Sequence, residues 1–196
     1  MIRSLTRLYS TVPKIEFPPS LLHLKVGKII QCERHQNAEK LYVSQIQINN
    51  DDENNINNTI QVCSGLVNYI PIDQMLHKRV ILVMNLKPSK MRGIKSEAMV
   101  LATEKVGCDN NEDTYKVELI NPPISSSIGQ RLQFEKFESE SEPSRLKPKI
   151  WEQIQLHLMT NEKGEAVYID DDKNQYLLKH GDDVAKSDTL CNSIIR

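Results

Sequence analysis

Short stretches in which apolar and polar residues alternate are the feature that most limits what this chain can fold into. The alternation is near regular over residues 22–32 and cleaner over residues 41–48, where one irregularity interrupts it. A repeat of two residues is the pattern of a β-strand with one buried face. Further strands are expected at residues 59–64, 80–85 and 98–103, with a short helical turn at 71–76. The first hundred residues are therefore expected to be mainly β.

Five short strands with one small helix fit a small closed or partly closed β-barrel, of which the five-stranded oligonucleotide-binding (OB) barrel is the commonest. After an acidic linker, apolar residues recur at helical spacing from Ile150 to Leu158, and two strand candidates follow. The fold expected is thus an OB barrel followed by a small α+β subdomain packed on it. The segments expected are a presequence at 1–12, a linker at 13–20, the OB-fold domain at 21–137 and the C-terminal subdomain at 144–196.

Positive charge is concentrated in one part of the chain, although the formal net charge is only −1. Residues 21–106 carry eleven basic and eight acidic residues, whereas residues 148–196 carry six basic and nine acidic ones. A polyanion would therefore be attracted to the first hundred residues and repelled by the C-terminal part. Within residues 78–95 there is no acid and there are six cations, namely Lys78, Arg79, Lys87, Lys90, Arg92 and Lys95.

This run of cations is typical of a phosphate-binding surface, because Lys and Arg spaced along a strand and the loop after it can contact successive phosphates. The alternative is a solvated charged face. Three features weaken that alternative: no acid interrupts the run, Gly93 lets the backbone turn closely, and Pro88 stiffens the loop. None of the ten aromatic residues (one Trp, six Tyr, three Phe) lies between residues 85 and 99. Recognition is therefore expected to depend on phosphates, 2′-hydroxyls and the shape of a folded RNA, with one apolar contact from Met91.

The sequence offers no constellation for catalysis. It lacks the Gly-x-Ser-x-Gly, Walker, His-Glu-x-x-His and Gly-x-Gly-x-x-Gly motifs. Cys63-Ser64-Gly65 has no supporting His or carboxylate in an obvious position, and His35 lies in a polar turn. The four cysteines are far apart and have no metal-ligand spacing, so we expect them to be reduced. We expect no enzymatic activity, no cofactor and no metal site.

Residues 1–12 differ from the rest of the chain because they contain two Arg, four Ser or Thr and no acid. An Arg-bearing, Ser-rich and amphipathic start resembles a mitochondrial presequence rather than a secretory signal. Arg7-Leu8-Tyr9 before Ser10 also resembles a matrix-processing site, with cleavage after Tyr9. We therefore expect the protein in the mitochondrial matrix. The alternatives are a frayed N-terminal tail and a cytoplasmic protein.

Four ordered motifs resemble a known family. They read HQNAEKLY at 35–42, VCSGLVNY at 62–69, NLKPSKMRGIKSEAM at 85–99 and KIWEQIQ at 149–155. Together they resemble the tRNA-binding domain of endothelial monocyte-activating polypeptide II, over about residues 21–196. A yeast cofactor of methionyl- and glutamyl-tRNA synthetases ends in the same domain, which is also appended to some methionyl- and tyrosyl-tRNA synthetases. Two departures are Gln36, where the family usually has proline, and a longer Asn-rich loop at 49–58.

The resemblance implies a noncatalytic tRNA-binding protein that delivers or retains tRNA for an aminoacyl-tRNA synthetase and has no synthetase catalytic domain of its own. In this family the second part imitates the dimer interface of a shorter bacterial relative. By this resemblance the chain is expected to be monomeric, with Trp151 and Ile154 in that interface core. No run approaches the roughly 18 apolar residues that a membrane span needs, so no membrane contact is expected. One alternative is a protein-interaction module for a synthetase complex, with RNA binding secondary. Another is a secreted signalling polypeptide, for which the sequence has no secretory signal.

The expected tRNA-binding residues fall into three groups. Lys87, Lys90, Arg92 and Lys95 would contact phosphates. Asn85 and Ser64 would hydrogen-bond the RNA backbone or ribose, beside the apolar contact from Met91. His35, Asn37 and Lys40 would line the neighbouring loop.

Overall fold

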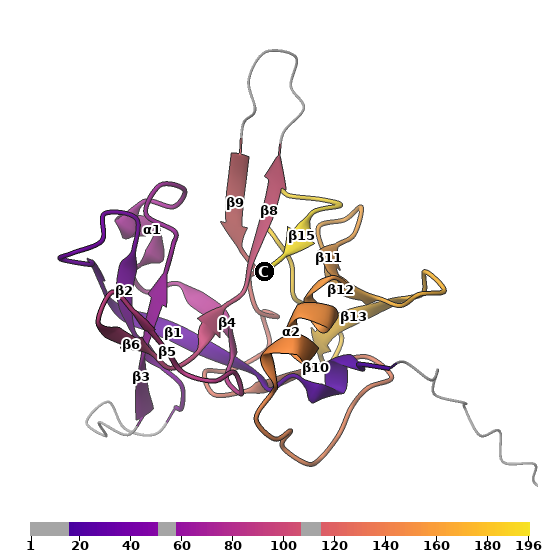
Figure 1. The fold of residues 1–196 in the computed structure, drawn as a ribbon. Coiled ribbons are helices and arrows are strands. Elements are labelled where there is room, and N and C mark those ends of the chain that lie inside the picture. Colours follow the sequence, from indigo (N-terminus) through magenta and orange to yellow (C-terminus); the bar gives the residue numbers. More distant parts are fainter. Residues whose placement is uncertain (1–15, 51–57, 107–114) are drawn as a thin grey trace, which may run out of the picture.

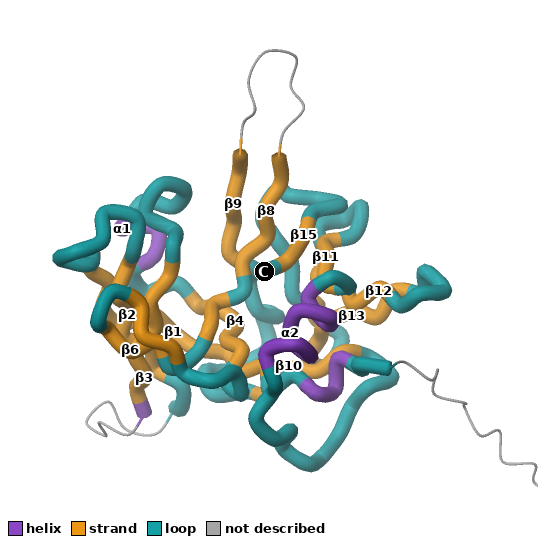
Figure 2. Tube along the Cα trace, viewed as in Figure 1, coloured by secondary structure: helices purple, strands orange, loops and turns teal. Residues whose placement is uncertain are grey.

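The computed structural model describes residues 16–50, 58–106 and 115–196. Over these residues the chain is mainly β, with antiparallel pairing between neighbouring strands and two short α-helices (Figures 1 and 2). Neither helix in this part of the chain has the length and apolar character that a membrane span requires. The expected presequence at residues 1–12 lies outside the described residues, as do residues 51–57 of the Asn-rich loop.

The N-terminal lobe, residues 19–100, contains most of the strands that the alternation predicts. The strand expected at 59–64 is present with these bounds, and those expected at 22–32, 41–48 and 80–85 are present with shifted ends. The strand expected at 98–103 is divided in two. The elements of this lobe are η1 (Pro19–Leu21), β1 (Leu24–Arg34), β2 (Tyr42–Gln47), β3 (Thr59–Ser64), α1 (Ile72–Met75), β4 (Arg79–Val83), β5 (Ser89–Met91), β6 (Ile94–Ser96) and β7 (Met99–Val100).

The long strand β1 organises this lobe. Its first half pairs with β4, its second half pairs with β2, and its first two residues also pair with β10. The register with β2 shifts between Ile29 and Gln31, which leaves Ile30 exposed. An irregularity of this kind bends a strand and increases its twist. The near-regular alternation of residues 22–32 is therefore interrupted where β1 bends.

The sheet of the N-terminal lobe does not close through a continuous ladder. β3 ends one side of the sheet, and β7 pairs with β4 on the other side. Gln61 of β3 and Glu97 exchange two hydrogen bonds across this opening, of 2.9 and 3.1 Å, and the Cys63 N–H donates to Ser96 Oγ at 3.0 Å. Between residues 21 and 106, the described residues form eight strands instead of the five expected, because bends and turns divide the backbone into shorter pieces.

The C-terminal lobe joins the same sheet, and the β8–β9 hairpin stands between the two lobes in Figure 1. The expected helix is α2 (Pro148–Gln155), and its proline occupies the first turn, where no backbone N–H is needed. The strands are β8 (Ala102–Val106), β9 (Tyr115–Leu119), β10 (Arg131–Phe134), β11 (Leu158–Thr160), β12 (Ala166–Ile169), β13 (Gln175–His180), β14 (Asp183–Val184) and β15 (Ile194–Ile195).

Two hydrophobic cores meet along β1. One core is formed mostly by the N-terminal lobe, including Ile29, Tyr42 and Met75, and is completed by Leu119 of β9. The other combines Leu24 and Val26 of β1 with residues of α2, β10, β12 and β13. Phe17, in the segment expected to be a linker, packs against this second core, and its carbonyl accepts a hydrogen bond from Tyr168. Because the lobes share one of their cores, we expect them to unfold together.

Gly27 offers a test of packing inside the N-terminal lobe. A Cβ added there would lie 2.6 Å from a methyl of Ile46 and 2.8 Å from a methyl of Leu82. We expect Gly27→Ala to lower the free energy of unfolding by about 1–3 kcal/mol, the usual cost of overpacking. Urea denaturation measures the loss. Gly65→Ala is the control, because nothing lies within 4 Å of its added Cβ. Equal stability of the two variants would contradict the packing described.

Glu118 of β9 anchors the end of the C-terminal lobe. Its carboxylate accepts hydrogen bonds from the backbone N–H groups of Thr189 and Leu190, at 2.8 and 3.2 Å, and lies 2.9 Å from Lys116 Nζ. Burial disfavours the charged form, but the hydrogen bonds from Thr189, Lys116 and Leu190 outweigh it and lower the pKa of Glu118 to about 2. The ionised side chain therefore stabilises the fold.

This depressed pKa predicts a dependence of stability on pH. The folded-state pKa lies below the ordinary value of 4.5, so the stabilisation is fully present above that pH and is lost as the pH falls towards about 2. We expect Glu118→Gln to lower the free energy of unfolding at pH 7 by about 1–3 kcal/mol. Urea denaturation of both proteins across this pH range is the measurement. If the free energy of unfolding of the variant fell as steeply with falling pH as that of the unmodified protein, another group would cause the acid dependence.

Candidate functional site

Of the cations of residues 85–99, Lys90, Arg92 and Lys95 lie on a small β-hairpin, and Lys87 lies two residues before it. β5 and β6 pair from Ser89↔Ser96 to Met91↔Ile94, which leaves Arg92 and Gly93 as a two-residue turn. Both turn residues have positive φ, 51° and 96° respectively. Hairpins with such turns have a backbone twist that matches their strands, and glycine is favoured in them. The sequence therefore places an arginine at the tip of a tight, well-defined turn.

Lys90 and Lys95 are direct cross-strand neighbours on this hairpin. Like charges in such a pair destabilise a hairpin. The carboxylate of Glu97 lies 2.8 Å from Lys95 Nζ and reduces the repulsion between the two lysines. This contact lowers the pKa of Glu97. Lys87, Lys90 and Arg92 are exposed and have no ion-pair partner among the described residues. The hairpin thus presents an uncompensated positive charge that an anion would neutralise.

Lys78 and Arg79 do not belong to this surface, which corrects the interpretation of residues 78–95 as one run. Lys78 Nζ lies 3.8 Å from a carboxylate oxygen of Asp188. The Arg79 guanidinium donates to Ser126 Oγ at 2.8 Å and to the Pro123 carbonyl at 3.1 Å. Both side chains therefore hold the loops of the C-terminal lobe against β4.

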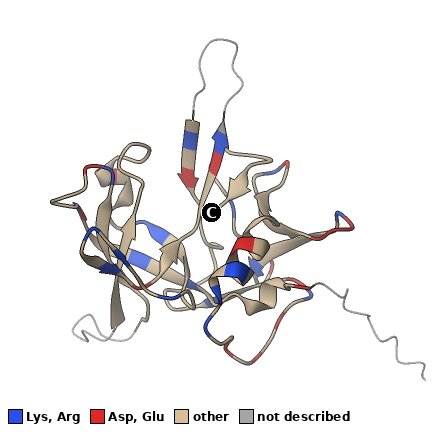
Figure 3. Cartoon of the chain, viewed as in Figure 1, with Lys and Arg blue, Asp and Glu red and all other residues tan. Residues whose placement is uncertain are grey.

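The β1–β2 loop lies beside the tip of the hairpin, as Lys40 and Arg92 line the same hollow of about 580 Å³. Asn37 also lines it and is exposed, whereas His35 is only 5% exposed. The Asn37 N–H donates to His35 Nδ1 at 3.0 Å. Of the three residues expected to line this loop, His35 therefore lies inside it and shapes it. Figure 3 shows the distribution of Lys and Arg over the chain.

Asn85 is also internal, being 9% exposed. Its amide Nδ2 donates to the carbonyls of Leu21 and Ser144, both at 2.8 Å, and its Oδ1 accepts from the His23 N–H at 3.1 Å. The Asn85 carbonyl accepts from the Leu146 N–H at 2.8 Å. The side chain fastens the start of the chain and the segment before α2 to the strand end. It has no free donor for a ribose, so its expected RNA contact is corrected to a structural role.

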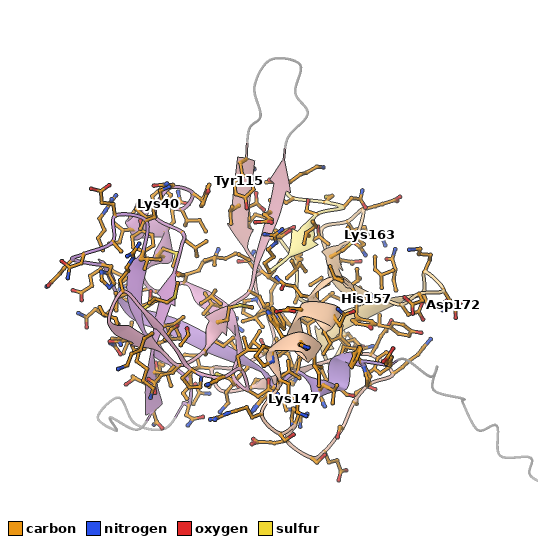
Figure 4. The ribbon with its side chains drawn as sticks, in the orientation of Figure 1. Lys40, Tyr115, Lys147, His157, Lys163 and Asp172 are labelled. Atoms are coloured by element: carbon orange, nitrogen blue, oxygen red, sulfur yellow. The ribbon has the colours of Figure 1, made fainter. Side chains whose placement is uncertain are left out.

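Ser64 and Met91 line a second cleft, of about 400 Å³, between β3, the basic hairpin and the β8–β9 hairpin. Tyr69 and Tyr115 line the same cleft, 43% and 40% exposed. Figure 4 shows Tyr115 on β9. These aromatic side chains lie beside the cations although none lies among them in the sequence. Sequence reasoning missed them because nothing local links two tyrosines so far apart along the chain.

No group of three or more His, Cys, Asp or Glu within the described ranges could hold a metal ion. Cys32, Cys63 and Cys191 have free thiols. The geometry that the described residues present is therefore a surface of cations beside an apolar, tyrosine-bearing cleft, which suits binding of a polyanion.

The sequence and the structure each resemble known proteins. The family described as "Putative tRNA binding domain" matches residues 24–131. Aminoacyl tRNA synthase complex-interacting multifunctional protein 1 of Cricetulus griseus is 37% identical over 194 residues, which are 97% of this chain and 49% of that protein. The tRNA-aminoacylation cofactor arc1 of Schizosaccharomyces pombe is 42% identical over 146 residues, 73% of this chain and 30% of the cofactor. This chain thus spans about half or less of these relatives.

Among solved structures, the C-terminal domain of Plasmodium vivax p43 has a similar fold. It superposes with a TM-score of 0.73 at 26% sequence identity, and the match covers 92% of this chain and 99% of that domain. The similarity therefore extends through both lobes.

The internal position of Asn85 gives a test within this site. We expect Asn85→Ala to lower the free energy of unfolding by at least about 1–3 kcal/mol, because two carbonyls and one N–H lose their partner. Chemical denaturation measures this loss. Asn37→Ala, at an exposed asparagine from the same predicted set, should change stability by less than about 0.5 kcal/mol. If the two variants were equally stable, Asn85 would not fasten the lobes together.

Proposed function

Because this chain belongs to the tRNA-binding-domain family that matches residues 24–131, we propose that it is a noncatalytic tRNA-binding protein. It retains or delivers tRNA for an aminoacyl-tRNA synthetase. The observation that carries the proposal is the set of exposed cations without an ion-pair partner among the described residues, namely Lys90 and Arg92 on the hairpin and Lys87 just before it. A folded RNA supplies the phosphates that compensate these charges, and binding releases counterions from the RNA.

The names of two relatives support a role beside a synthetase. One is called complex-interacting and the other an aminoacylation cofactor, and both are longer than this chain. Exposed cations that can contact successive phosphates suit retention of a tRNA. The partner that we propose is a member of the class of aminoacyl-tRNA synthetases.

The finer architecture that we propose is an OB barrel made from β1 to β4 and the β7 segment. Its support is the pairing of β1 with both β2 and β4, and the contacts of Ser96 and Glu97 across the opening to β3. In an OB barrel, strands and loops on one side bind the nucleic acid. The basic hairpin and the β1–β2 loop occupy neighbouring positions on this unit.

We also propose that the chain is monomeric and that the C-terminal lobe takes the place of a second subunit. Ile154 is fully buried in the core shared with β1, and Trp151 packs against the same core.

The alternative to the proposed function is that this acidic lobe docks a synthetase and that RNA binding is secondary. A pull-down of synthetase with the full chain, in which acidic residues of this lobe are replaced by basic ones, separates these two functions. Loss of the synthetase with tRNA binding intact would favour docking by the lobe.

The mitochondrial matrix is the compartment that we propose from the composition of residues 1–12. Deleting these residues from a tagged protein should abolish its mitochondrial signal in imaging. A mitochondrial signal that survives the deletion would refute this part of the proposal and leave the RNA-binding function untouched.

Charge reversal of Lys90 tests the RNA surface. We expect Lys90→Glu to weaken tRNA binding about tenfold at moderate salt and to reduce the salt slope by roughly one phosphate. The stability of the protein should stay constant or rise slightly, because the variant replaces a like-charged cross-strand pair by an opposite pair. Fluorescence anisotropy with labelled tRNA over a salt series measures the first effect.

Lys163→Glu is the matched control. Lys163 is also exposed and lies in the C-terminal lobe (Figure 4). Its replacement by Glu changes the net charge by the same amount as Lys90→Glu. Its affinity for tRNA should stay within about twofold of the unmodified protein. An equal loss in both variants would mean that only the overall charge matters, and it would overturn the assignment of the hairpin.

A further inference from the structure

The cleft beside the basic hairpin has largely apolar walls, which contacts to phosphates do not explain. Its volume of about 400 Å³ lies within the range of about 300–1,000 Å³ that ligand pockets usually have. Leu86, Met91, Val100 and Val117 give it largely apolar walls. Gly65 stands at the wall with nothing within 4 Å of its added Cβ, so the space in front of it is open.

Two exposed aromatic rings lie at this cleft. The ring centroids of Tyr69 and Tyr115 are 5.1 Å apart, and the rings are tilted by 57°. Tyr115 donates a hydrogen bond to Glu104, which fixes its ring. That hydrogen bond, together with burial, raises the pKa of Tyr115 to about 12. The phenol is therefore neutral at physiological pH and does not repel a phosphate.

The acidic residues of the cleft are already paired. Glu97 is 2.8 Å from Lys95 Nζ, and Glu104 is 2.7 Å from Arg196 Nε. Lys87, by contrast, lines the cleft and has no ion-pair partner among the described residues. The cleft thus combines apolar walls, neutral rings and one uncompensated cation. That combination suits a flat aromatic group that carries a phosphate.

We propose that this cleft takes one unpaired nucleobase of the bound RNA, stacked against Tyr69 or Tyr115, with an adjoining phosphate at Lys87. The inference rests on the proposed RNA-binding function and deepens it. Its basis is continuity, because Lys87, Ser89 and Met91 belong both to the basic segment and to the cleft wall. Aromatic stacking of a base is sequence-tolerant, since every base has a flat face.

A consequence is discrimination between RNAs that carry the same charge. A base inside a continuous duplex is stacked and paired, so it cannot enter the cleft without a cost of unstacking. A tRNA has unpaired bases in its loops and at its single-stranded end. The protein should therefore bind tRNA more tightly than a blunt RNA duplex with an equal number of phosphates.

The test compares two pairs of substitutions in the full chain. Tyr69→Ala with Tyr115→Ala should weaken tRNA binding about 5- to 100-fold. The same variant should bind the blunt duplex as the unmodified protein does, with an unchanged salt slope on tRNA because no cation is lost. Tyr69→Phe with Tyr115→Phe keeps both rings and should keep the affinity for tRNA. Fluorescence anisotropy measures affinity, and thermal unfolding monitors the fold.

A direct readout uses a short single-stranded RNA with one 2-aminopurine. Its fluorescence should be quenched by the unmodified protein and by the phenylalanine variant, but not by the alanine variant. Gly65→Leu is a second variant that fills the cleft from its open side. It should weaken tRNA binding and abolish the quenching without removing any ring or cation.

The outcomes separate the two proposals. If the unmodified protein fails to bind tRNA, the proposed function is wrong. If tRNA binds but the alanine variant and Gly65→Leu leave both affinity and quenching unchanged, only the base site is overturned, and the cleft is then open to a peptide of a protein partner. A loss of affinity that is equal for tRNA and duplex would likewise overturn the base site.

Discussion

Strand β1 belongs to two hydrophobic cores at once, and this double membership sets the positions of the other elements. Leu24 and Val26 enter the core shared with α2 and the C-terminal strands, whereas Ile29 enters the core of the N-terminal lobe. Leu24 and Val26 lie on one face of β1 and Ile29 on the other, so the alternation of faces along a strand lets β1 serve both cores. Burial of apolar side chains on both faces then fixes β2, β4 and β10 around β1.

The surface proposed to bind RNA depends on this frame in a particular way. The β5–β6 hairpin is a separate two-stranded sheet that pairs with no other strand of the described chain. Hydrogen bonds from the β3 backbone to Ser96 and Glu97 hold it against the larger sheet. These hydrogen bonds keep β6 in place although the exposed cations of the hairpin repel one another.

Long-range polar ties fix the arrangement of the lobes. Asn85 connects the end of β4 to His23 and to Ser144, which precedes α2, whereas Glu118 of β9 holds the loop at Thr189 and Leu190 within the C-terminal lobe. Buried polar groups of this kind are costly when unpaired, so each tie specifies one arrangement of the lobes. The cleft between the basic hairpin and the β8–β9 hairpin exists because that arrangement is fixed.

The alternation of residues determined the mainly β fold and most of the strand positions, since burial of one face requires a period of two. The spacing of Ile150, Trp151 and Ile154 likewise determined α2, which ends at Gln155, so that Leu158 begins β11 instead of extending the helix. The cations from Lys87 to Lys95 marked where exposed positive charge gathers. These are local properties that a chain carries before it folds.

Only the tertiary structure decided which polar residues face inward and which distant residues meet. Asn85 and His35 look like surface groups in the sequence, but the first has partners about sixty residues away and the second is covered by its own loop. Lys78 and Arg79 continue the basic run in the sequence, yet their partners are loops of the C-terminal lobe. Tyr69 and Tyr115 come together only when β9 folds beside the N-terminal lobe. Burial and partnership depend on the packing of whole elements, which no short stretch of sequence contains.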